Sequence, residues 1–145
     1  MALTHVQLHE LAIRHIRAEA AGDIDTILST LEDEPFYELH PLGLRFSGRD
    51  AVRRYYEWLC TEFAARQRHT ELIGEYVGDA GVVFEYRMWV ARDDGTEVVH
   101  NLIGIDVAGE TAFAGERIYG DPELIEMMVG PLLDDAVRMP DERAG

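Results

Sequence analysis

The spacing of apolar residues divides the chain into two parts. As far as about residue 65, apolar side chains recur at intervals of three and four, as at Leu8, Leu11 and Ala12, which is typical of helices that bury one face. Over residues 70–121 the pattern alternates with period two, which is typical of half-buried strands. Helices followed by an antiparallel meander predict an α+β fold.

Local signals set the ends of the first two predicted helices. Thr4 followed by Gln7 has the spacing of a capping box, and Gly22 suits the end of the first helix. Asp23 can cap a second, short helix, and we expect Pro35 to stop it. Both helices therefore precede the first predicted strand.

The remaining elements are bounded by turn signals. Asp94-Gly95 between two alternating runs is a strong hairpin signal. The expected elements are a strand over 36–40, a helix from Ser47–Asp50 to about Phe63, strands over 70–77, 82–90, 97–107 and 111–120, and a helix over 122–129. We expect one domain over residues 1–145, with a charged tail that frays from about residue 134.

Composition narrows the class of partner. Thirteen basic residues against 28 acidic ones give a net charge of -15, which disfavours nucleic acid and anionic membranes as partners. Cys60 is the single cysteine, so the chain has neither an internal disulfide nor a cysteine-rich metal site. We find no signal peptide and no stretch of transmembrane length, and expect a cytoplasmic protein.

Two strings carry a resemblance to a known family. The run Y-E-L-H-P-L-G-L-R-F-S-G-R-D-A-V, residues 37–52, resembles the first half of SnoaL-like proteins of the nuclear transport factor 2 superfamily. The run G-E-R-I-Y-G-D-P-E-L, residues 115–124, resembles the end of the same domain and a strand of limonene epoxide hydrolases. The resemblance implies a cone: a curved, mostly antiparallel sheet wrapped around the N-terminal helices. The superfamily includes isomerases such as ketosteroid isomerase, dehydratases, polyketide cyclases, epoxide hydrolases and proteins without catalysis.

The resemblance also suggests which residues face the interior of the cone. Epoxide hydrolases place an Arg-x-Asp pair on one central strand, and the matching positions here are Glu85 and Arg87. Ile118 stands where their last-strand Asp would be, and Tyr37 matches a tyrosine that helps to hold water there. Because the charged positions differ, the epoxide hydrolase mechanism does not carry over to this chain. The resemblance implies catalytic residues at Glu85, Arg87, His100 and Glu116, and pocket-lining residues at Tyr37, Tyr55, Trp58, Leu59, Trp89, Leu102 and Ile118.

Two points have an alternative interpretation. Periodicity alone places Phe84, Tyr86, Met88 and Val90 in the core, which would leave Glu85 and Arg87 on the solvated face of the sheet. Asp121 precedes a proline at the start of a predicted helix, which favours a helix cap over a catalytic acid.

The functional hypothesis is an enzyme without cofactor or metal that acts on a hydrophobic small molecule by acid–base chemistry. Polyketide-like or terpenoid-like substrates fit, in a cyclase, isomerase, dehydratase or hydrolase reaction, and Glu85→Gln should abolish turnover. The alternative is a small-molecule-binding protein without catalysis. In either case we expect a homodimer, with the outer face of the sheet as the contact surface.

Overall fold

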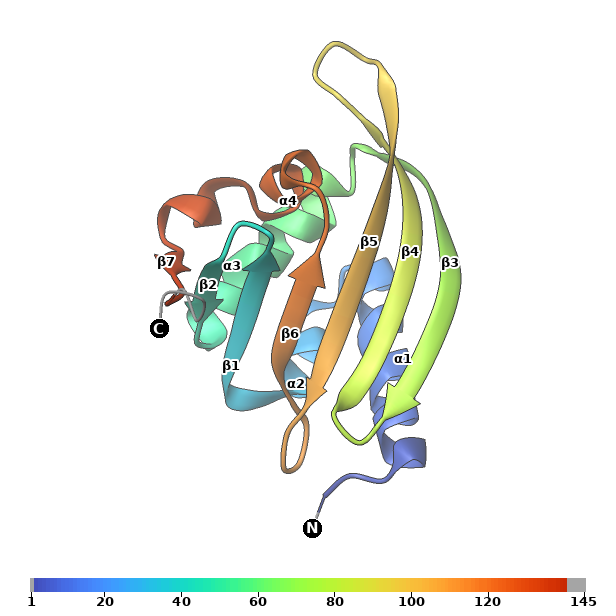
Figure 1. Cartoon of the computed structure of the whole chain (residues 1–145), viewed down its shortest axis with the longest axis vertical. Coiled ribbons are helices and arrows are strands. Elements are labelled where there is room, and N and C mark those ends of the chain that lie inside the picture. Colours follow the sequence, from blue (N-terminus) through green and yellow to red (C-terminus); the bar gives the residue numbers. More distant parts are fainter. Residues whose placement is uncertain (1, 141–145) are drawn as a thin grey trace.

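The structure, a computed structural model, is described for residues 2–140 and has helices on one side of a long curved sheet (Figure 1). The elements in chain order are α1 (His5–Ala21), α2 (Ile24–Ser29), β1 (Leu31–His40), β2 (Leu44–Ser47), α3 (Arg49–Trp58), the π-helical turn η1 (Leu59–Phe63), β3 (Gln67–Gly78), β4 (Gly81–Ala91), β5 (Glu97–Ala108), β6 (Phe113–Tyr119), α4 (Pro122–Val129), the 3-10 turn η2 (Gly130–Asp134) and β7 (Val137–Arg138). The predicted α+β class is confirmed.

Within residues 2–140 the sheet has seven strands in the order β3-β4-β5-β6-β1-β2-β7 and is not closed. Strands β3 to β6 form the predicted antiparallel meander, with β4 and β5 joined at the predicted hairpin. Strand β1 pairs in parallel with β6. Parallel strands cannot be joined by a tight turn, and here a long stretch of chain that includes α3 lies between them. The sheet therefore has one continuous inner face, which the helices cover.

Helix α1 follows from its sequence signals. The Thr4 hydroxyl accepts a hydrogen bond from the backbone of Gln7, whose side chain accepts one from the backbone of Thr4, and Gly22 ends the helix in the left-handed conformation. The buried residues of α1 recur every three or four positions and face the inner side of the sheet: Leu8, Ala12, His15 and Ala18.

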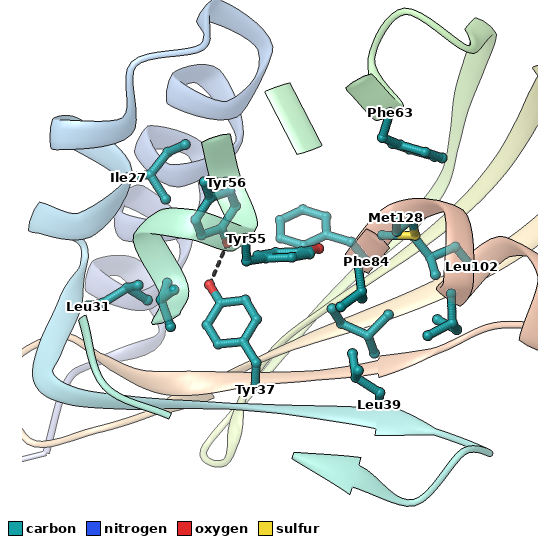
Figure 2. Packing of buried hydrophobic residues seen from close by; sticks show 14 of the residues in the cluster. Ile27, Leu31, Tyr37, Leu39, Tyr55, Tyr56, Phe63, Phe84, Leu102 and Met128 are labelled. Carbon is teal, nitrogen blue, oxygen red and sulfur yellow. Dashed lines mark hydrogen bonds between the residues drawn. The ribbon is translucent and has the colours of Figure 1, made fainter. Parts of the chain in front are cut away.

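The core lies between the helices and the inner face of the sheet. Figure 2 shows Tyr37 rising from β1 to meet Tyr55 and Tyr56 of α3, while Phe84 and Leu102 approach from the central strands. Rings of Tyr37, Tyr55 and Tyr56 pack with centroids 4.9–5.8 Å apart, within the range of favourable aromatic contacts. The interior of the cone is thus rich in hydroxyl-bearing aromatic side chains.

The structure corrects several predicted boundaries. Pro35 does not separate α2 from a strand over 36–40; it lies inside β1, which begins at Leu31. The register of β1 against β6 shifts between Leu31 and Phe36, and such irregularities are where a strand accommodates a proline. The sequence pattern does not predict β2 and β7, since both strands are short and depend on their neighbours more than on their own pattern.

The C-terminal segment is ordered further than expected. Helix α4 has its predicted bounds, and η2 and β7 follow it, with β7 paired to β2. Residues 141–145 lie outside the described part, so the predicted fraying is not tested there. Among the described helices, none combines the length and the apolar character that crossing a membrane requires.

The packing of α1 gives a matched pair of substitutions. Leu8 is 0% exposed and Val6 is 67% exposed on the same helix. Leu8→Ala should lower the free energy of unfolding by about 2–5 kcal/mol, because it removes buried contacts and leaves a cavity. Val6→Ala should change it by less than about 0.5 kcal/mol. Urea unfolding followed by circular dichroism measures both, and equal losses would show that α1 does not pack as described.

Candidate functional site

The predicted residues of β4 do not face the interior. Glu85 pairs with Ile103 and Arg87 with Asn101 on β5, and these pairs lie on the outer face of the sheet. The Arg87 guanidinium approaches the Glu71 carboxylate at 4.0 Å, and Glu85 accepts a hydrogen bond of 3.3 Å from the Tyr76 hydroxyl. The expected inward orientation of Glu85, Arg87 and Trp89 is therefore wrong, because the apolar residues of β4 take the core side, as the period-two pattern indicated.

His100 does lie on the inner face, at the end of β5 near α4. It is opposite Met88 on β4 and its side chain is 3% exposed. Its Nδ1 lies 2.5 Å from Oδ2 of Asp121. Since a carboxylate only accepts hydrogen bonds, Nδ1 is the donor in this pair. Among residues 2–140, Nε2 of His100 has no hydrogen-bond partner although it is buried.

Asp121 has two structural tasks. Its Oδ1 accepts a hydrogen bond of 2.9 Å from the backbone of Leu124, which confirms the predicted cap of α4, and its Oδ2 holds His100. Burial tends to raise the pKa of Asp121, but the hydrogen bonds from Leu124 and His100 outweigh it and lower that pKa overall. Asp121 therefore links the last helix to the central sheet as an ionised carboxylate.

Glu116 of β6 is the second predicted catalytic residue, after His100, that lies on the inner face of the sheet. It lies opposite Asp106 on β5 and Tyr37 on β1, both of which are buried. Its carboxylate leans across Gly104, where an added Cβ would come within 2.8 Å of Oε1. Glycine at position 104 thus leaves the space that the carboxylate occupies, and a part of Glu116 remains accessible.

Two further polar residues join Glu116, and the sequence analysis did not select them. His15 of α1, Asp106 and Glu116 each offer an atom that could bind a ligand, and these atoms lie within 4.8 Å of one another. His15 could have been found because it shares the helical face of Leu8 and Ala12. Asp106 could have been found because it has the strand parity of His100 and Leu102.

A chain of hydrogen bonds connects α1, α2, α3 and β1 inside the cone. The Thr30 hydroxyl donates to the backbone oxygen of Ile27, so it accepts from Nδ1 of His15 at 2.6 Å. Nε2 of His15 lies 3.0 Å from the Tyr56 hydroxyl, which is bonded in turn to the Tyr37 hydroxyl, as the dashed line in Figure 2 shows. The chain therefore ends at Tyr37, the neighbour of Glu116 across the sheet.

Burial dominates the electrostatics of the cluster. Desolvation, and then the charges of Asp106 and Glu19, raise the pKa of Glu116 well above its usual value. Desolvation likewise raises the pKa of Asp106 to about 6, although the charge of His15 opposes this. Burial lowers the pKa of His15, but its bond to Glu19 and the charge of Asp106 outweigh burial and raise it overall.

The tyrosine hydroxyls of the cluster stay neutral. Desolvation, with the charge of Glu116 next for Tyr37 and Tyr55, raises the pKa of each far above its usual value. Desolvation does the same for Tyr56, with the charge of Tyr37 next. These side chains can therefore donate hydrogen bonds but not act as bases.

One histidine and two carboxylates are also a donor set that divalent transition metals accept. In this arrangement Nδ1 of His15 is bonded to Thr30, and Nε2 lies 3.1 Å from Glu19 and 3.0 Å from Tyr56. A cation would have to displace these partners from Nε2. The geometry is thus better matched to holding and moving protons.

The predicted pocket-lining residues fall into three groups. The first group is buried on the inner side of the sheet or on α3: Tyr37, Tyr55, Leu102 and Ile118. Tyr37 and Tyr55 lie close enough to Glu116 for its charge to raise their pKa. Leu59 is partly buried against the core, and Trp58 donates a hydrogen bond of 2.9 Å to the backbone oxygen of Met127. Trp89 lies on the outer face, beside His69.

Comparison with solved structures supports this fold. A proposed SnoaL-like polyketide cyclase from Jannaschia sp. CCS1 is similar with a TM-score of 0.69 and 14% identity, over 87% of this chain and 93% of that one. Bal32a, from a soil-derived mobile gene cassette, has a TM-score of 0.67 and 14% identity, over 84% and 95%. A proposed isomerase from Bacillus subtilis has a TM-score of 0.65 and 13% identity, over 88% and 96%. No curated protein matches the sequence.

At such identities the solved structures show the fold, and the sequence itself shows the family. Residues 12–120 match the family described as the SnoaL-like domain, and this match includes β1 to β6 and the residues of the buried cluster. The chain belongs to the SnoaL-like domain family and has its nuclear transport factor 2-like fold.

Proposed function

We propose that this protein is a cofactor-free enzyme that transfers protons on a hydrophobic small molecule, with Glu116 as the acid and base. The observation that carries the proposal is the state of the Glu116 carboxylate. It lies on the inner face of the sheet, within 4.8 Å of ligand atoms of His15 and Asp106, and desolvation followed by the charge of Asp106 raises its pKa well above the usual value. Carboxylates whose pKa is strongly shifted by burial and by a neighbouring charge concentrate at functional sites.

The cluster provides the parts that proton transfer needs. With its raised pKa, Glu116 holds a proton to higher pH than an exposed glutamate and can donate it to a carbonyl or a leaving hydroxyl. Its ionised form is a strong base, because the interior solvates the charge poorly. Tyr37 is the neutral hydroxyl adjacent to Glu116 and would donate to an enolate or alkoxide oxygen as charge develops.

Asp106 and His15 have supporting roles in this scheme. The charge of Asp106 helps to keep Glu116 protonated. His15 positions the Tyr56 hydroxyl, which is hydrogen-bonded in turn to the Tyr37 hydroxyl. His100 stands six positions from Asp106 along β5, about 20 Å in an extended strand, so it does not exchange protons with Glu116 directly.

The reaction class and the substrate class are supported by chemistry and by the similar structures. Isomerisation, dehydration and cyclisation all need a proton moved at or beside a carbon next to a carbonyl. The similar structures include proteins described as a polyketide cyclase and as an isomerase. The aromatic lining favours flat or alicyclic compounds of polyketide or terpenoid type. The alternative is the same interior in a protein that binds such a compound without converting it.

We also propose that two copies associate through the outer face of the sheet. Tyr76, Val99 and Ile103 are exposed there and Trp89 is half-buried, so strands β3 to β5 present an apolar surface. Glu85 and Arg87 lie on the same face with opposite charges. In a two-fold dimer, Glu85 of each copy could therefore pair with Arg87 of the other copy.

A first prediction tests the acid–base role with 5-nitrobenzisoxazole, a flat apolar carbon acid. A carboxylate base removes its ring C–H proton, the N–O bond breaks and a coloured cyanophenolate forms. Turnover by the wild type should rise with pH as Glu116 loses its proton, and Glu116→Gln should lower kcat/KM by about 100-fold or more. Absorbance of the product measures both.

The matched control for this prediction is Glu85→Gln. Glu85 is on the outer face, so turnover should persist, which reverses the expectation drawn from the sequence. Equal turnover by Glu116→Gln and the wild type contradicts the acid–base role. A wild type that binds the probe, as a thermal shift reports, without turning it over supports the binding alternative.

A second prediction concerns the stability cost of Asp106. Its pKa rises from 3.8 in the unfolded chain to about 6 in the folded one, so the folded state binds the proton more tightly. Stability therefore falls as pH rises from about 4 to about 6, and the full penalty is present above that range. Asp106→Asn should raise the free energy of unfolding near neutral pH by about 1–3 kcal/mol and have a smaller effect near pH 4.

Urea unfolding at both pH values measures this difference. The exposed Asp33→Asn is the matched control and should change stability little at either pH. A loss of stability in Asp106→Asn at neutral pH would contradict this prediction. It would mean that the attraction between Asp106 and His15 outweighs the cost of burying the Asp106 charge.

A third prediction tests association. Val99→Glu combined with Ile103→Glu should convert a dimer into a monomer, because it places charges at the centre of the apolar outer face. Val6→Glu, on the helical side, is the control and should leave the dimer intact. Light scattering after size exclusion gives the masses. A wild type that stays monomeric over the whole concentration range refutes the interface.

A further inference from the structure

A large hollow lies away from the buried cluster, at the edge of the sheet where β2 and β7 pair. Its volume is about 1240 Å³, more than the roughly 300–1,000 Å³ of typical small-molecule sites. Strands β1, β2, β6 and β7, helix α3 and the turn η2 contribute its lining, which includes Glu38, Arg45, Arg54, Arg117, Tyr119 and Arg138. We call it the arginine groove.

The charge of the arginine groove is opposite to that of the chain. Among residues 2–140, four arginines and two carboxylates line it, an excess of two positive charges in a chain of net charge -15. All 13 basic residues of the sequence are arginines, so this groove holds almost a third of them. Such a concentration of positive charge attracts anions.

The centre of the groove is a row of charged side chains across three strands. Glu38 of β1 pairs in register with Arg45 of β2 and Arg117 of β6. Its carboxylate is 15% exposed and lies 3.6 Å from the Arg45 guanidinium, 3.2 Å from Nε of Arg117 and 3.4 Å from Nε2 of His40. One carboxylate thus holds two guanidinium groups in place, and their remaining N–H donors are available to a ligand.

An apolar and aromatic surface adjoins this row. The rings of His40 and Tyr119 stack with centroids 4.5 Å apart and an interplanar angle of 10°. Tyr119 is exposed, so part of its ring is open to a ligand, and Leu42, Leu132 and Met139 give the groove an apolar side. A flat apolar group would therefore find a stacking surface next to the guanidinium groups.

We propose that the arginine groove binds small organic anions, which have a flat apolar body and a carboxylate, sulfonate or phosphate group. The anion is held between Arg45 and Arg117, whose planar guanidinium groups suit two-point contacts with such groups. The flat body lies against Tyr119. This site is separate from the Glu116 cluster and does not depend on proton transfer there: Glu38, His40, Arg117 and Tyr119 lie on the face of the sheet opposite to Tyr37, Glu116 and Ile118.

The test compares two fluorescent probes that differ in one group. 8-Anilinonaphthalene-1-sulfonate has an aromatic body with a sulfonate, and N-phenyl-1-naphthylamine has the same body without it. In the double variant Arg45→Gln, Arg117→Gln, the affinity for the sulfonate probe should fall roughly tenfold, the loss expected for one charge-assisted hydrogen bond. The affinity for the neutral probe should change little.

A matched double variant controls for net charge. Arg17→Gln with Arg68→Gln removes the same charge from exposed positions of α1 and β3, which do not line the arginine groove. It should leave the binding of the sulfonate probe unchanged, and both double variants should keep the wild-type circular dichroism spectrum. Equal weakening by the two double variants, or no weakening by either, overturns the proposal.

A second variant locates the apolar body. Tyr119→Ala keeps all charges of the arginine groove and should weaken the binding of the sulfonate probe several-fold, as loss of an aromatic platform does. Unchanged binding in Tyr119→Ala, together with unchanged binding in the arginine variant, would place the probe elsewhere on the molecule. The Glu116→Gln variant should bind the sulfonate probe as the wild type does, which separates this test from that of the enzyme.

Discussion

The register between β5 and β6 is the constraint on which the interior depends. It sets Asp106 directly opposite Glu116 on the inner face, so two carboxylates enter an apolar space side by side. A slip of β6 by one residue would send Glu116 to the outer face and bring its neighbours inside. In the observed register, neither carboxylate can ionise without cost, since like charges and desolvation both favour the protonated form. The rest of the interior is arranged around this pair.

The helices complete the arrangement because each supplies a different polar group. Helix α1 brings His15, α3 brings Tyr55 and Tyr56, and the end of α2 brings Thr30, which fixes the proton of His15 on Nδ1. These residues come from segments as far apart as α1 and β6 in the sequence. Their hydrogen bonds therefore form only once the helices are docked on the sheet, and they tie proton-handling groups to the same contacts that build the core.

The two faces of the sheet have different chemistry. The inner face is apolar apart from the cluster around Glu116 and the His100–Asp121 pair near α4. The outer face carries charged residues with exposed apolar ones among them, and toward β2 and β7 it passes into the arginine groove. An acidic cluster and a groove rich in arginines thus occupy different sides of one sheet.

Much of the fold could be predicted from the sequence, and less of the candidate site. The caps of α1, α2 and α4, the four long antiparallel strands and the hairpin at Asp94-Gly95 follow from local signals that short-range sterics and hydrogen bonds enforce. On β4 the alternation of apolar residues identified the core face correctly. The matched motif of a distant relative pointed to the wrong face, because its charged residues are not those of this chain.

What the sequence determined by itself was therefore local: which segments are helices or strands, where most of them end, and which side of each buries apolar atoms. What only the tertiary structure decided was which polar residues meet. Glu116 needed the pairing of β6 with β5 and β1, and His15 needed the docking of α1. The arginine groove needed two short strands, β2 and β7, with almost no pattern of their own. Such contacts join residues far apart in the chain, and no local spacing rule specifies them.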